Sequence, residues 1–160
     1  MKKLKEGQRY ENALVEVAAS LQLSRNTIVA LLSVQSWKPF LQRWLRGCIT
    51  LMDIKASSSV LDTTSKAADD ILKRMTQTAE KSIPRSAENI GLAVGALCLV
   101  LPPSAHATKA SASKFLLSWL FQHEHEYRQW PAAISLGIIS SCLHVTDHKQ
   151  KFQNINALLE

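Results

Sequence analysis

The chain has 160 residues, of which 46% are hydrophobic and 20% charged, and it contains only 5 glycines and 5 prolines. This composition excludes a disordered or fibrous protein, because the apolar residues are numerous enough to form a core. The formal net charge is +6, and residues 1–50 hold most of the excess, with eight Lys or Arg against three acidic residues. The length fits one ordinary domain or three to four helical-repeat units.

The first elements in chain order are a basic N-terminus and two helices. Residues 1–9 predict a flexible terminus, and apolar spacing predicts a helix over about residues 10–21. Ser24 is then a candidate N-cap for a short second helix. The two helices together predict a helical hairpin.

The third predicted helix has the most regular pattern in the chain. Ser36 is its expected N-cap and Pro39 lies in its first turn, where proline is well tolerated. Apolar residues then follow at spacings of three and four, which is typical of one buried helix face. These residues are Trp37, Phe40, Leu41, Trp44, Leu45, Cys48 and Met52.

This helix also carries the candidate partner-binding residues. Trp37 and Trp44 fit either core packing or anchoring of a partner, since tryptophan is enriched in binding hot spots. Lys38, Arg43 and Arg46 fall away from the apolar stripe. They fit either a solvated helix face or a phosphate-binding face, and they do not line one narrow strip.

In the remainder of the chain, the sequence pattern predicts a polar loop, four helices and a final helical segment. The fifth helix of the chain has almost no polar face after Asn89, so it should be covered on several sides. The expected positions are a loop at 55–60, helices at about 62–82 and 85–101, a helix capped by Ser104, a helix at about 130–144, and a segment from Asp147.

Cysteines and the longest apolar run bear on the cellular compartment. Cys48, Cys98 and Cys142 are far apart and lack metal-binding spacing, and no signal peptide precedes them. The pattern is typical of free thiols in a reducing compartment. The longest apolar run, residues 90–101, is shorter than the about 20 residues that a membrane-spanning helix needs. We therefore expect a cytoplasmic protein without a membrane span.

One cluster resembles a metal site but has the wrong spacing. His123 and His125 are separated by a single residue, Glu124, whereas a zinc metalloprotease helix places its histidines four residues apart. Two residues apart on a helix, the imidazoles point away from each other. The segment therefore predicts a solvated helix terminus. Since no nucleophile elbow or phosphate loop occurs either, we expect a chain without catalytic residues, cofactor, metal or small-molecule substrate.

An internal echo gives the best indication of architecture. Residues 90–100 return 44 residues later at 134–144, within the roughly 40 to 47 residues of HEAT and armadillo repeats. Gly91 and Gly95, one turn apart, predict a close approach of a neighbouring helix. Four aligned pairs are identical, although two helices of similar composition can also match by chance: Ile90/Ile134, Leu92/Leu136, Cys98/Cys142 and Leu99/Leu143.

The echo predicts an all-α fold of antiparallel helix pairs stacked as an armadillo/HEAT-like solenoid segment. Residues 10–160 would form this helical-repeat segment. The last apolar pattern has no stop signal before Glu160, which favours a fragment of a longer array.

Residues 82–106, 115–121 and 133–144 resemble the focadhesin family, and the resemblance extends over most of residues 10–160. Focadhesins are very long animal proteins made of armadillo/HEAT-like repeats. The resemblance implies a cytosolic scaffold at focal adhesions, with vinculin as a partner, and association with the Ski messenger-RNA surveillance complex. It assigns no partner-binding residues in this chain, because no family motif places them.

Two hypotheses follow for function. The first is a non-enzymatic protein-interaction scaffold, which the echo and the resemblance favour. The alternative is a basic helical module that binds RNA, based on the charge of residues 1–50 and on Trp37 and Trp44. Nucleic acid is the less expected partner, because the basic residues are dispersed.

Overall fold

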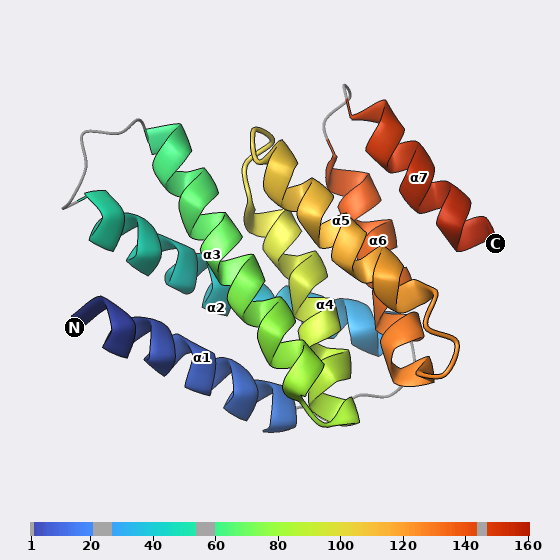
Figure 1. Cartoon of the computed structure of the whole chain (residues 1–160), viewed down its shortest axis with the longest axis horizontal. Coiled ribbons are helices and arrows are strands. Elements are labelled where there is room, and N and C mark those ends of the chain that lie inside the picture. Colours follow the sequence, from blue (N-terminus) through green and yellow to red (C-terminus); the bar gives the residue numbers. More distant parts are fainter. Residues whose placement is uncertain (1, 21–26, 54–59, 144–146) are drawn as a thin grey trace.

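A computed structural model describes residues 2–20, 27–53, 60–143 and 147–160. The regular structure in these ranges is entirely α-helical, which confirms the predicted all-α class (Figure 1). The described part of the chain contains seven helices: α1 (Lys2–Ser20), α2 (Thr27–Asp53), α3 (Val60–Lys81), α4 (Pro84–Val100), α5 (His106–Leu120), α6 (Glu126–Cys142) and α7 (His148–Leu159).

Helix α1 begins well before the predicted start at Tyr10, so the basic residues 2–9 belong to the helix instead of preceding it. Tertiary contacts explain the longer helix. Gly7 lies against the guanidinium of Arg74 in α3, and the ring of Tyr10 stacks on Trp44 in α2. Packing against two other helices stabilises early turns that the sequence pattern alone does not predict.

Helix α2 is continuous where two helices were expected, and the predicted N-cap at Ser36 is wrong. The Ser36 hydroxyl donates to the carbonyl of Leu32 at 2.9 Å, a bond that serine forms inside helices. Pro39 therefore lies inside α2, not in a first turn, while Ser24 lies outside the described residues. The buried stripe passes through the expected boundary without a break: Ala30, Val34, Trp37, Leu41, Trp44 and Leu45.

Other helix boundaries differ from expectation by a few residues. Ala105, not Ser104, is the N-cap of α5, and α6 begins at Glu126, so Pro131 lies inside that helix. The predicted loop at 55–60 lies outside the described residues except for Val60, where α3 begins.

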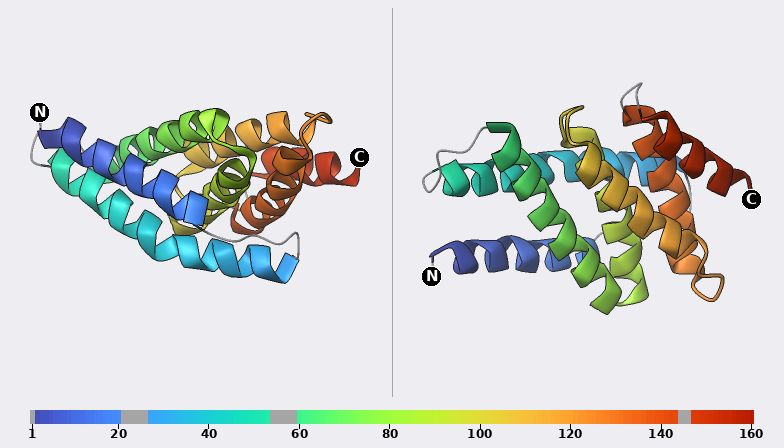
Figure 2. Two further views of the ribbon diagram at one scale, coloured as in Figure 1. Left: turned by 90° about the horizontal axis from the view of Figure 1, so that it is seen from below. Right: turned by 45° about the horizontal axis from the view of Figure 1, so that its top comes forward.

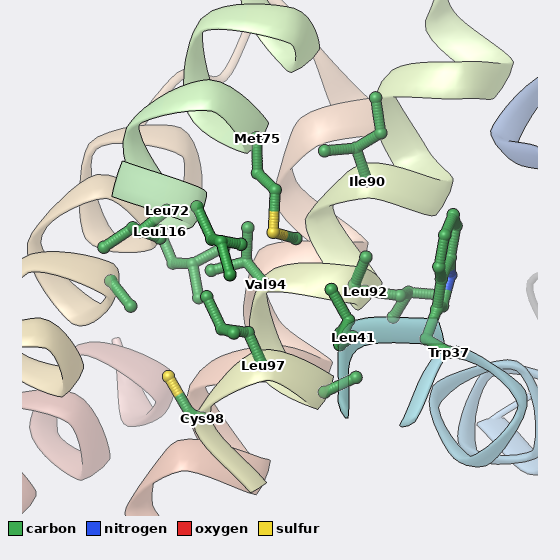
Figure 3. Close-up of a cluster of buried hydrophobic side chains, with 14 of the residues drawn as sticks. Trp37, Leu41, Leu72, Met75, Ile90, Leu92, Val94, Leu97, Cys98 and Leu116 are labelled. Carbon is green, nitrogen blue, oxygen red and sulfur yellow. The ribbon is translucent and has the colours of Figure 1, made fainter. Parts of the chain in front are cut away.

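Helix α4 is the centre of the molecule and is covered by α1, α2, α3, α5 and α6, as its missing polar face predicted. It begins with Pro84 in its first turn, where the absent N–H costs nothing. Figure 3 shows side chains of α4 meeting those of neighbouring helices in the core. The labelled core residues are Trp37, Leu41, Leu72, Met75, Ile90, Leu92, Val94, Leu97, Cys98 and Leu116, all of them buried.

The two segments of the sequence echo lie in α4 and α6, which pack directly against each other. The Ser135 hydroxyl donates to the Gly91 carbonyl at 2.8 Å, and the Cys142 thiol lies 3.6 Å from the Cys98 carbonyl. Each contact joins residues 44 apart, so the two helices run in the same direction and in register. Gly95 permits this approach, since a Cβ built there would lie 2.7 Å from Ser135 Oγ.

Helices α3, α5 and α7 form a second row beside α4 and α6 (Figures 1 and 2). Two side-chain hydrogen bonds join α3 to α5, each between residues 39 apart: Thr108 to Asp69 at 2.6 Å and Trp119 to Glu80 at 2.9 Å. The contact of α5 with α7 includes a bond from Asn154 to Ser113 at 3.1 Å. Constant separations show that α3 and α5 also run in the same direction.

The N-terminal helices α1 and α2 do not continue these two rows. Helix α1 lies across the ends of α3 and α4, where Asn89 donates to the carbonyl of Ala18 at 2.7 Å. Helix α2 runs behind α3 and α4 and reaches α6 (Figure 2). Within the described ranges, no helix combines the length and hydropathy that crossing a membrane requires.

Candidate interaction surface

The five predicted partner-binding residues all lie on α2, but the structure divides them between core and surface. Trp37 and Trp44 are buried, so neither ring is accessible to a partner, and the core-packing alternative describes them correctly. Lys38 is half-buried, whereas Arg43 and Arg46 are exposed. Of the predicted set, only Arg43 and Arg46 are therefore fully exposed to solvent.

An aromatic cluster joins α1 to α2. Tyr10 stacks on Trp44 with ring centroids 5.7 Å apart and nearly parallel planes, at 6°. Phe40 meets the edges of Tyr10, Trp37 and Trp44 at centroid distances between 5.6 and 6.2 Å. The two helices meet through these large side chains and not by close approach of their backbones. The spacing leaves room between the helices.

That room is a groove of ≈ 560 Å³ along the α1–α2 boundary, which we call the α1–α2 groove. Half-buried Tyr10 and Phe40 form its apolar part, and exposed Arg9 and Arg43 lie on its opposite walls. The complete lining is Glu6, Arg9, Tyr10, Ala13, Ser36, Pro39, Phe40 and Arg43.

The charges in the α1–α2 groove differ from those in an adjoining groove of ≈ 320 Å³ that shares Glu6 and Tyr10. In the adjoining groove, Arg74 is neutralised by Glu11 at 3.3 Å and by Asp70 at 3.2 Å. Arg9 and Arg43 take part in none of the ion pairs found among the described residues. The α1–α2 groove thus combines apolar surface with two unneutralised guanidinium groups.

Sequence reasoning identified Arg43 but missed the residues that α1 contributes, which are Glu6, Arg9, Tyr10 and Ala13. The apolar spacing of α1 was visible, yet nothing in it indicated that α1 lies beside α2 with Tyr10 against Trp44. The unusual density of aromatic residues in α2 was the one available signal, because a stripe of large rings needs a partner surface.

The histidine cluster lies where a solvated helix terminus was predicted. His123 and Glu124 are exposed in the turn between α5 and α6, and His125 is the N-cap residue of α6. His123 Nδ1 lies 3.2 Å from the side-chain amide of Gln129. In the described part of the chain, no group of three or more His, Cys, Asp or Glu residues is arranged to hold a metal ion.

A second cluster of chemically capable side chains lies between α4, α5 and α6, with Cys98 buried and Cys142 half-buried. Lys109, only 2% exposed, donates to the Cys142 carbonyl at the end of α6 at 3.1 Å. A cation there interacts favourably with the helix dipole. Burial raises the pKa of the Cys98 thiol strongly and that of Cys142 as well, so both thiols stay protonated and are poor nucleophiles at neutral pH.

Comparison with known proteins gives no relative on which a function could rest. No protein-family model matches the chain, and no curated protein or solved structure matches it.

Proposed function

We propose that the chain is a non-enzymatic protein-interaction scaffold, built as an armadillo/HEAT-like solenoid segment. The observation that carries the proposal is the in-register packing of α4 on α6 through contacts between residues 44 apart. Stacked repeats have this property, because each unit packs against the next through equivalent positions. The row of α3, α5 and α7 supports the same arrangement, with antiparallel helices following one another along the chain.

Exposed apolar side chains also support a role in association. Phe152 and Leu159 on α7 are 72% and 81% exposed, and Leu32 on α2 is 62% exposed. Repeat units leave such surfaces where a further unit or a partner packs. The resemblance to focadhesins leads us to propose a cytoplasmic location at focal adhesions, with vinculin or subunits of the Ski complex as partners.

The alternative function, RNA binding, rests on the exposed guanidinium groups of Arg9, Arg43 and Arg46. We favour the protein scaffold for two reasons. Arg46 does not line the α1–α2 groove, and among the described residues no row of accessible aromatic faces lies beside the guanidinium groups. Single-stranded RNA would need such faces for its bases to stack on.

The test uses the purified chain with purified vinculin, with Ski-complex subunits, and with a single-stranded RNA oligonucleotide. We expect protein binding that survives nuclease treatment and falls less steeply with rising salt than RNA binding does. RNA binding with a steep salt dependence would instead support the alternative, since displaced counterions make such affinities fall as salt rises. Absence of binding to every protein tested would contradict the proposed partners.

A further inference from the structure

We propose that the α1–α2 groove binds an acidic segment of a partner protein, with an apolar side chain between Tyr10 and Phe40 and carboxylates on Arg9 and Arg43. The inference rests on the proposed scaffold function and names the chemistry of the partner. Its basis is the combination of an apolar floor and two unneutralised cations in one groove.

The shape of the groove fits an inserted side chain. The ring stack of Tyr10 on Trp44 holds α1 and α2 apart, and Ala13 and Pro39 contribute small, apolar lining beside it. The volume of ≈ 560 Å³ exceeds what one large apolar side chain occupies. A partner segment can therefore bury such a side chain without displacing the aromatic cluster, which is already packed.

The charges select an acidic partner. Arg9 extends from α1 and Arg43 from α2, so carboxylates on either side of an inserted apolar residue can each meet one guanidinium group. Glu6 is the single acidic residue of the lining, and the described contacts include no ion pair between it and either arginine. Arginine suits this role because its planar fork binds a carboxylate through two hydrogen bonds.

The aromatic geometry favours a peptide over RNA. Single-stranded RNA binds through bases that stack on open aromatic faces. Here one face of Tyr10 is covered by Trp44, and Phe40 packs edge-on against both rings. The remaining half-buried surface of Tyr10 and Phe40 suits an aliphatic or aromatic side chain that enters the groove from solvent.

The experiment is an amide NMR titration of the isotopically labelled chain with a short peptide that carries one leucine between pairs of glutamates. Two further probes are the same peptide with every glutamate replaced by glutamine, and an oligouridine. We expect the acidic peptide to shift the amide resonances of residues around Tyr10, Ala13 and Arg43. The glutamine peptide should bind about tenfold more weakly, because it lacks the two ion pairs.

Matched variants test the location. Arg9→Gln with Arg43→Gln should weaken binding of the acidic peptide about tenfold, whereas Arg46→Gln with Arg85→Gln removes the same charge from exposed positions outside the groove and should leave it unchanged. Ala13→Trp fills the groove without changing charge and should also abolish binding. Dispersed amide spectra verify that each variant is folded.

Three results would overturn the proposal: no shifts with the acidic peptide, equal weakening in both arginine pairs, or stronger binding of the oligouridine at the same residues. Neither of the first two results bears on the scaffold function, which the binding test with purified proteins decides separately. Preferred binding of oligouridine would contradict both.

Discussion

At the residue scale, the contact between Gly95 and Ser135 determines how closely α4 and α6 approach. An added Cβ at Gly95 would lie 2.7 Å from the hydroxyl oxygen, 2.9 Å from the Cβ and 3.1 Å from the backbone Cα of Ser135. A rotation of the serine side chain relieves the first of these contacts but not the last. The separation of the helices must therefore increase if any side chain is introduced.

We predict that Gly95→Ala lowers the free energy of unfolding by about 1–3 kcal/mol through overpacking, although alanine favours helix by about 1 kcal/mol over glycine. Gly137→Ala is the matched control, because nothing lies within 4 Å of a Cβ built at that exposed position of α6. The control should raise the free energy of unfolding by about 0.5–1 kcal/mol. Urea denaturation measures both, and a stabilised Gly95→Ala would contradict the close helix contact.

At the element scale, α2 and α6 each contain an internal proline, but in different surroundings. Pro39 is exposed, whereas Pro131 is buried against α4. A Cβ built on Gly91 of α4 would lie 3.2 Å from the Cβ of Pro131. Each proline removes one hydrogen bond of the helix, to the carbonyl four residues earlier. Only Pro131 offsets that loss by packing.

We predict that Pro39→Ala raises the free energy of unfolding by about 1–3 kcal/mol, because it restores an amide donor and improves helix propensity. Part of the gain is offset by the greater freedom of the unfolded chain. Pro131→Ala should gain less or lose stability, because it removes buried contacts with α4. If Pro39→Ala were neutral or destabilising in thermal unfolding, α2 would not be one regular helix through this position.

The sequence predicted the helices with a strong, continuous apolar stripe, and the differences lie where local signals compete with packing. Ser36 and Pro39 are typical of a helix start, yet α2 continues across them because its apolar stripe is buried on both sides of that point. Only the α2 side of the α1–α2 groove could be predicted, because local sequence patterns do not show how two helices pack against each other. Arg43 follows from the pattern of α2, whereas its pairing with Arg9 depends on how α1 docks.

At the scale of the whole molecule, exposed apolar residues occur on α7 and at the start of α2. Phe152 and Leu159 belong to α7, and Leu31 and Leu32 to the first turns of α2. Helix α6 contacts both of these helices, and Figure 2 shows the start of α2 beneath α6. Exposed apolar side chains of this size are typical of a surface that another chain or a second copy covers.

We predict reversible self-association of the isolated chain, with a dissociation constant that rises about tenfold or more in Phe152→Glu, because burial of a phenylalanine stabilises by about 1.5–3 kcal/mol. Leu32→Glu should act in the same direction if the start of α2 belongs to the same interface. Lys149→Glu is the control for charge, since Lys149 is exposed on α7 and contributes no apolar surface. Sedimentation velocity over a wide range of concentration measures all three. A monomer at every concentration would contradict the prediction, and equal weakening by Lys149→Glu would assign the association to charge instead of apolar burial.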